Sequence, residues 1–201
     1  MNLHKKFKKI LPIHAMERYL IHLKNEKYIP VNSREILHRS RDLISGIDAH
    51  IRLVRVATNF IEFDVAIETK NVDALVEKLI PIGDLDNTRH VVEEEIEIDQ
   101  GIKDGIFYFN HERFWECHEA FEGVWKKCFG REKQLVQGII LVAVAYAHAQ
   151  ENELRIGVAM LTRALDKLGT SPSMYHSIDV ERIRKKSIEM QQIDDLIIFE
   201  I

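Results

Sequence analysis

Cysteine is scarce in this chain, and the patterns in which cysteine usually serves a structural or chemical role are absent. The two cysteines, Cys117 and Cys128, are eleven residues apart. On one helix this spacing separates them by roughly 16 Å along the axis, so a disulfide between them would require the helix to break. There is no CxxC zinc pattern. The sequence therefore predicts a protein of a reducing compartment, the cytoplasm.

Long hydrophobic runs are also missing. The longest, residues 138–147, is far shorter than the roughly 20 residues that a bilayer-spanning helix needs. The first residues lack the apolar segment and cleavage site of a signal peptide. The chain contains no phosphate-binding glycine loop and no GxSxG. We therefore expect neither a membrane partner nor these two kinds of catalytic site.

The chain has no excess of positive charge. It carries 28 Lys and Arg against 32 Asp and Glu, a net charge of −4, which argues against broad binding of nucleic acid. Residues 1–15 are a basic N-terminal extension and the exception, and a membrane- or RNA-touching arm is one interpretation of them. A frayed extension is the interpretation we favour. The lysines concerned are Lys5, Lys6, Lys8 and Lys9.

The first half of the chain predicts a small α+β domain over residues 16–96. Strand patterns and helix patterns follow one another in the order β-α-β-β-α-β, which is the ferredoxin-like arrangement. The expected strands cover residues 19–23, 51–57, 60–67 and 89–92, and the expected helices cover residues 33–45 and 71–80.

That fold serves many functions, so only the particular residues of this chain can distinguish among them. RNA binding needs aromatic side chains on one face of the central strands and a basic surface. Phe60 and Phe63 lie on opposite faces, and residues 16–98 hold 11 Lys and Arg against 16 Asp and Glu. We expect no nucleic-acid partner. The sequence favours a dimerisation or regulatory domain, which leaves a homo-oligomer open.

The second half predicts an all-α bundle of about five helices over residues 97–192. The tail, residues 193–201, is apolar and is expected to dock as a strand or loop on either domain. The expected helices cover residues 98–110, 112–128, 132–150, 152–168 and 179–191.

The stretch at residues 109–125, FNHERFWECHEAFEGVW, is the most distinctive part of the chain. At about 100° per residue, His118 lies in the middle of the apolar face of the helix, and Glu122 lies beside it. Glu119 lies at the edge, and Glu116 points the other way. A buried His and Glu each require a partner or an altered protonation state.

The following helix is apolar around nearly its whole circumference, apart from Gln137 and His148. If the two helices form an antiparallel hairpin, Glu122 faces Gln137. His148 then faces Asn110 or His111. The sequence therefore predicts two polar layers inside the bundle.

These residues resemble the family called domain of unknown function 309 over about residues 99–168. The resemblance implies a compact all-α bundle and supplies no accepted activity. The chain departs from the family at Glu112, where the family usually has Gly, which puts the turn before the motif helix in question. The matching positions are Asn110, Trp115-Glu116, His118-Glu119, Glu122, Trp125, Gln137-Gly138 and His148, followed by Asn152 and Gly157.

Three interpretations of the motif follow, and the favoured one is a structural polar network that fixes the register of the helices. Its members would be Asn110, His118, Glu122, Gln137 and His148.

The second is a metal-dependent hydrolase in which His118 and Glu122, at i and i+4, ligate a divalent metal and Glu119 is the general base. It lacks obvious further ligands, and no other cofactor is predicted. The third is a small-molecule pocket rimmed by Trp115 and Trp125.

Overall fold

The structure, a computed structural model, describes residues 16–92 and 95–201. The basic extension and residues 93–94 of the acidic connector lie outside the described residues. The elements are, in chain order, β1 (Glu17–Lys24), η1 (Pro30–Asn32), α1 (Ser33–Leu43), β2 (Ala49–Val56), β3 (Phe60–Ile67), η2 (Thr69–Asn71), α2 (Val72–Leu79), β4 (Leu85–Val91), α3 (Ile98–Asn110), α4 (Phe114–Lys127), α5 (Gly130–Gln150), α6 (Leu154–Leu168), β5 (Met174–Tyr175), β6 (Ile178–Asp179) and α7 (Val180–Ile193).

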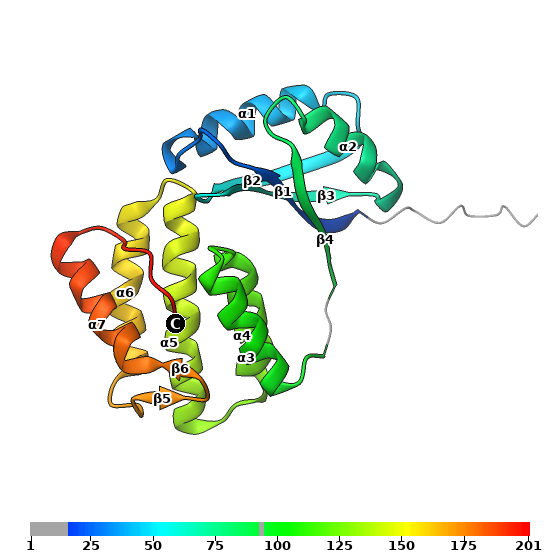
Figure 1. Cartoon of the computed structure of the whole chain (residues 1–201). Coiled ribbons are helices and arrows are strands. Elements are labelled where there is room, and N and C mark those ends of the chain that lie inside the picture. Colours follow the sequence, from blue (N-terminus) through cyan, green and yellow to red (C-terminus); the bar gives the residue numbers. More distant parts are fainter. Residues whose placement is uncertain (1–15, 93–94) are drawn as a thin grey trace, which may run out of the picture.

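Strands β1 to β4 form one antiparallel sheet in the order β2-β3-β1-β4, and α1 and α2 cover one of its faces (Figure 1). β1 and β3 pair along their whole length, which puts Ile21 opposite Phe63 and His22 opposite Glu62. Ile21 and Phe63 are fully buried in the core that the sheet forms with α1 and α2. Because neighbouring side chains alternate between faces, His22 and Glu62 point to the opposite face. The sheet thus has one apolar face and one polar face.

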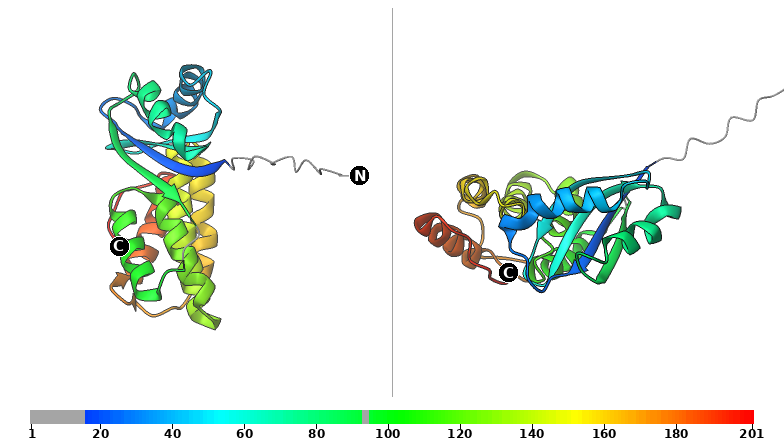
Figure 2. Two further views of the ribbon diagram at one scale, coloured as in Figure 1. Left: turned by 90° about the vertical axis from the view of Figure 1, so that its right-hand side faces the viewer. Right: turned by 90° about the horizontal axis from the view of Figure 1, so that it is seen from above.

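Five helices, α3 to α7, make up the second half of the described chain and stand against the polar face of the sheet (Figures 1 and 2). Helix α5 is 21 residues long and lies between α4 and α6. Its apolar residues, such as Val136, Ile139 and Val142, are fully buried. A helix that is apolar on most sides needs neighbours on most sides, which explains its central place.

The C-terminal tail packs against the helices and does not reach the sheet as a strand. Phe199 is 7% exposed and contacts Phe109 and Tyr146. The amide of Ile201 donates to Oδ1 of Asn110 at 3.0 Å, and the Tyr146 hydroxyl donates to the carbonyl of Ile197. Of the two expected ways of docking, the tail takes the loop form.

The predicted elements agree closely with the observed ones, with two differences. Strand β4 begins at Leu85 instead of residue 89, because it pairs with β1 as far as Leu23. The short hairpin β5–β6 precedes α7 in a stretch for which the sequence predicted no strand.

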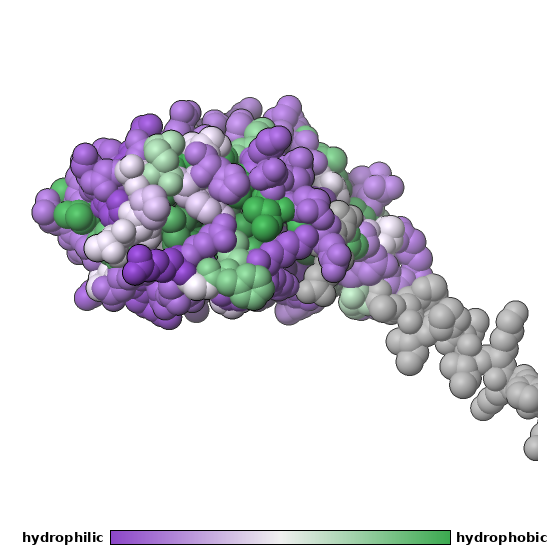
Figure 3. Space-filling view, turned by 90° about the horizontal axis from the view of Figure 1, so that it is seen from below, coloured by the Kyte–Doolittle hydropathy of each residue, from purple (hydrophilic) through white to green (hydrophobic). Residues whose placement is uncertain are grey.

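The described residues contain two separate hydrophobic cores, one within residues 19–82 and one within residues 102–199. The division of the chain near residue 96 stays a prediction. No helix in the described ranges is long and apolar enough to cross a membrane. Figure 3 shows the end of the helical region away from the sheet, where hydrophilic side chains dominate and apolar ones lie between them.

Candidate functional site

Helix α4 carries the distinctive motif and lies between the bundle and the sheet. Glu116 in its first turn and Lys126 and Lys127 in its last turn complement the helix dipole. Its apolar side chains, including Phe114 and Phe121, are buried in the core of the bundle. Its polar side chains turn toward the polar face of the sheet. We call the contact between α4, the end of α5 and this face the seam.

Glu116 is the most deeply buried charge in the seam, with no exposed surface. Its Oε1 accepts a hydrogen bond from Nη1 of Arg89 on β4 at 3.0 Å. Both carboxylate oxygens also accept from Arg113, one turn earlier. Nε2 of His22 on β1 lies 3.6 Å from Oε2. Glu116 faces away from the core of the bundle, as expected, but it is buried because the sheet covers the helix face that lies outside the bundle.

Arg55 and Glu62 form a second buried pair beside it, and each is 1% exposed. Nη1 of Arg55 donates to Glu62, and Nε donates to Oε1 of Glu151 at 2.8 Å. Nε2 of His22 lies 3.1 Å from Oε2 of Glu62. Burial alone would raise the pKa of Glu62, but the charge of Arg55 and the hydrogen bond from His22 outweigh it and lower the pKa to about 2.

Glu119 joins the motif to β1. Its Oε1 accepts from Nη1 of Arg18 at 2.8 Å and from Nε1 of Trp115 at 2.9 Å. The other side of the Arg18 guanidinium binds both carboxylate oxygens of Asp64. The guanidinium carbon of Arg55 lies 4.4 Å from the centre of the Trp115 ring, a cation–π contact. These contacts make Glu119 an ion-pair partner of the sheet, and they do not favour its predicted role as a general base.

His118 is partly exposed and does not belong to the core of the bundle, so its predicted place in the middle of the buried face was wrong. Cys117, Phe121 and Val124 form that face. The ring of His118 packs on Trp115, with the ring centres 4.7 Å apart. Burial lowers the pKa of His118, and Arg55 and Arg18 lower it further against the opposing charge of Glu122. Its Nδ1 is buried and has no hydrogen-bond partner among the described residues. His118 is therefore a neutral imidazole near neutral pH.

The two predicted polar layers inside the bundle do not form. Within the described chain no hydrogen bond joins Glu122 to Gln137, and both side chains are partly exposed. His148 bonds to Glu153 instead, with 2.7 Å between Nδ1 and Oε2. The reason is the tight turn after α5, where Asn152 has a φ of 65° and folds the chain back.

The predicted partners of His148 are also engaged elsewhere. Asn110 binds the C-terminal residue, as described above, and Nδ1 of His111 lies 2.7 Å from the carbonyl of Phe107.

Two clusters among the described residues have the residue types and spacing of metal ligands. Neither includes His118 or Glu122, so the structure does not bring a third ligand to the predicted pair. In the buried cluster, Arg55, Arg89 and Arg113 already supply positive charge to the carboxylates. The clusters are His22, Glu62 and Glu116, and His148, Glu151 and Glu153.

Besides a cavity of about 390 Å³ that Arg89, Glu119 and Glu122 line, two cavities flank the seam. One, of about 380 Å³, is lined by Trp115 and His148 together with three arginines, Arg18, Arg52 and Arg55. Trp125 does not line it, since ten residues separate the two tryptophans along α4. The ring of Trp125 instead makes a cation–π contact with Lys133, whose Nζ lies 3.9 Å from the ring centre. The expected rim of two tryptophans is therefore reduced to Trp115.

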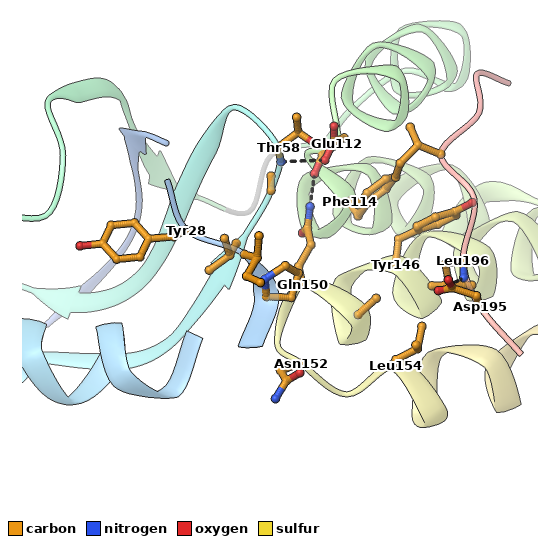
Figure 4. A pocket seen from close by; sticks show the side chains of 16 residues that line it. Tyr28, Thr58, Glu112, Phe114, Tyr146, Gln150, Asn152, Leu154, Asp195 and Leu196 are labelled. Atoms are coloured by element: carbon orange, nitrogen blue, oxygen red, sulfur yellow. Dashed lines mark hydrogen bonds between the residues drawn. The ribbon is translucent and has the colours of Figure 1, made fainter. Parts of the chain in front are cut away.

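The other cavity, of about 480 Å³, lies at the β2–β3 turn, where the α4 start, the α5 end and the tail meet (Figure 4). Two hydrogen bonds cross its inner end, and both involve Glu112. Its Oε2 accepts from the amide of Thr58 at 3.0 Å, and its carbonyl accepts from Nε2 of Gln150 at 2.8 Å. Glu112 has a φ of 58°, a left-handed conformation that suits Gly, the usual residue here in the family it resembles.

The strand residues of the seam were missed by the sequence interpretation. A polar residue at every second strand position is typical of a solvent-exposed face. A signal was nevertheless present, because β1 and β3 were predicted as inner strands of the sheet. His22 on β1 and Glu62 and Asp64 on β3 put polar and acidic side chains on one face of those strands.

Comparison with known proteins shows that the motif lies within the range matched by a family model. The model of a family described as a domain of unknown function (DUF309) matches residues 102–160, which confirms the predicted resemblance over this range. No curated protein matches the chain. Among solved structures, a conserved hypothetical protein from Thermus thermophilus is similar at 24% identity and a TM-score of 0.41. The alignment covers 45% of this chain and 95% of that one.

Proposed function

We propose that the helical region is an interaction module whose recognition surface is the polar side of α4. In this chain the α/β region, which we assign to the ferredoxin-like class from its element and strand order, occupies that surface and acts as a regulatory or dimerising partner. One observation carries the proposal. Glu116, a residue of the family-like motif, is fully buried and is held by Arg89 from β4 as well as by Arg113.

Buried ion pairs favour this interpretation because they contribute specificity more than net stability. Removing two charges from water costs about as much as their attraction returns, so the gain lies in rejecting other surfaces. The sheet presents Arg18, Arg55 and Arg89 to the motif, and α4 presents Glu116 and Glu119. A smooth apolar contact would give no such selection of partner or register.

Two further ties join the regions away from α4. The hydroxyl of Ser33 donates to the carbonyl of Glu151 at 3.2 Å, and the Thr58 amide donates to Glu112. Arg55 also reaches Glu151 at the end of α5. These contacts extend the seam over both helices and provide a route by which a change in the sheet reaches the bundle.

Hydrogen exchange on the full chain tests the proposal. We expect Glu116→Gln to speed amide exchange in β1, β4 and α4 together, by at least about tenfold, because one seam carboxylate holds all three. Glu122→Gln is the matched control, since this motif glutamate makes no hydrogen bond within the described chain. Faster exchange confined to α4 would show that the motif does not hold the sheet, and the proposal would fail.

A metal-dependent hydrolase is an alternative with weaker support, since His118 and Glu122 have no third ligand among the described residues. Elemental analysis of protein purified without added metal checks it. If no metal copurifies and none binds at micromolar concentration, that function is lost.

A small-ligand protein is the other alternative. The cavity beside Trp115 favours an anionic ligand, because Arg52 is half exposed and makes one long contact, 3.5 Å, to Asp64. Titration with inorganic phosphate, read by tryptophan fluorescence and repeated on Arg52→Gln, would decide. An unchanged signal in both proteins would exclude phosphate as the ligand.

A further inference from the structure

The cavity in Figure 4 differs from the cavity beside Trp115 in the charge that it presents. Its walls are mostly apolar and include Phe114, Tyr146, Leu154 and Leu196. The rings of Phe114 and Tyr146 stack with their centres 4.5 Å apart, and because each is only 2% exposed they form the closed base of the cavity. A volume of about 480 Å³ is in the range of small-molecule sites. The cavity is thus suited to a ligand with an apolar body.

The charged side chains that line this cavity, Glu112 and Asp195, are both acidic, and its described lining contains no Lys, Arg or His. The carboxylate of Glu112 accepts one hydrogen bond, from the Thr58 amide. Asp195 accepts one, from the amide of its neighbour Leu196. Neither carboxylate has a salt-bridge partner among the described residues. The cavity therefore combines apolar walls with unneutralised negative charge at its margin.

We propose that this cavity binds an organic cation, a primary amine on an aromatic or short aliphatic body. The ammonium group would pair with Asp195, Glu112 would add negative charge from the other side of the cavity, and the body would lie between them, against Phe114, Tyr146 and Leu154. An anionic ligand of the same shape is repelled by both carboxylates, and a neutral one gains only the apolar contact. This inference goes beyond the interaction module and does not depend on it.

Separate titrations with three probes of similar shape test whether binding requires a positive charge on the ligand. The probes are phenethylamine, its neutral analogue 2-phenylethanol and the anion 3-phenylpropionate, each titrated into the full chain and followed by backbone amide NMR shifts. We expect phenethylamine to bind at least about tenfold more tightly than 2-phenylethanol, with shifts around Phe114 and Leu154, and 3-phenylpropionate to bind weakest. Equal affinity for the amine and the alcohol, or no shift at these residues, overturns the proposal.

Two substitutions test whether the two carboxylates of the cavity attract the ammonium group. Asp195→Asn and Glu112→Gln should each weaken phenethylamine binding at least about threefold and leave 2-phenylethanol unchanged. Asp194→Asn is the matched control, because Asp194 precedes Asp195 but does not line the cavity. Asp195 is exposed and makes only a local hydrogen bond, so its variant reports on binding even if Glu112→Gln loosens the turn. Unchanged amine affinity in the Asp195 variant would refute the assigned site.

Discussion

Both sides of α4 contain fully buried side chains, but different interactions surround them. Toward α5, Phe121 and Val124 have no exposed surface and contact apolar neighbours. Toward the sheet, Glu116 has no exposed surface either, and its neighbours are Arg89, Arg113 and His22. Apolar contacts tolerate sliding and repacking, whereas an ion pair in a dry site requires its partner in one place. The bundle side provides cohesion, and the sheet side fixes which surface docks and in which register.

The same contrast separates the two cavities beside the seam. Arg18, Arg52 and Arg55 line one together with Asp64 and Glu151, whereas the charged residues that line the other, Glu112 and Asp195, are both acidic. Each arises where the two regions meet, so each exists only in the docked arrangement. A ligand for either cavity would stabilise the docked state by mass action, because it binds that state alone. Ligand binding and docking are therefore coupled in this architecture.

The largest effect is expected from removing the central charge of the seam. Glu116→Ala should lower the free energy of unfolding by about 3–5 kcal/mol, because Arg89 and Arg113 both lose their fully buried carboxylate partner. That is as much as the apolar side should lose in Phe121→Ala, about 3–5 kcal/mol. Urea denaturation measures both. Glu189→Ala, an exposed pair with Lys186, is the control and should change stability by less than about 1 kcal/mol. If Glu116→Ala lost as little stability as this control, water would have to reach the charged groups of the seam.

The pH dependence of stability measures the contribution of the Glu62 carboxylate to the free energy of unfolding. Its pKa falls from an ordinary 4.5 to about 2 on folding, which corresponds to about 3 kcal/mol of stability. Because the folded-state pKa is the lower one, this contribution is complete above about pH 4.5 and disappears as the pH falls toward 2. Denaturation curves of the wild type and Glu62→Gln between pH 5 and pH 2 should therefore converge. Curves that stay parallel would show that Glu62 is not a buried, paired carboxylate.

A pair of glycine substitutions compares helix packing within the bundle with the surface of α4. A Cβ on Gly157 would lie 2.4 Å from the backbone carbonyl oxygen of Ala145, whereas one on Gly123 would meet nothing within 4 Å. Gly157→Ala should destabilise by about 1–3 kcal/mol, because α5 and α6 must separate. Gly123→Ala should stabilise by about 0.5–1 kcal/mol through helix propensity. Thermal unfolding gives both signs, and two changes of the same sign would contradict the close approach of α5 and α6.

The smallest effect is expected at the left-handed residue. Glu112→Gly should relieve about 1 kcal/mol of backbone strain and lose about as much with the Thr58 hydrogen bond, for a net change within about 0.5 kcal/mol. Glu112→Ala keeps the strain and loses the bond, so it should destabilise by about 1–2 kcal/mol. Chemical denaturation of the two variants side by side distinguishes them. If Ala is no worse than Gly, Glu112 does not hold a strained turn.

Much of the local structure follows from the sequence. The helix at Ile98–Asn110 and the strand at Phe60–Ile67 were predicted with their observed ends, because capping, glycine and alternation act over a few residues. The helical wheel also placed Phe114 and Phe121 on the buried side of α4. It did not predict the burial of Glu116, since a wheel built for a helix in a bundle assigns one side to solvent. The expected contact between Glu122 and Gln137 failed for a related reason, because a register counted from one turn ignores where the helices diverge.

What the sequence by itself determined is the set of helices and strands, the apolar cores on which they close, and the family-like motif between Asn110 and His148. These depend on periodicity and on neighbours a few residues apart. Only the tertiary structure decided the role of the polar half of that motif, because its partners Arg18 and Arg89 come from strands far away in the chain. A charged side chain looks the same in the sequence whether water or a buried arginine solvates it. The free energies differ by several kcal/mol, and that difference exists only once the sheet covers α4.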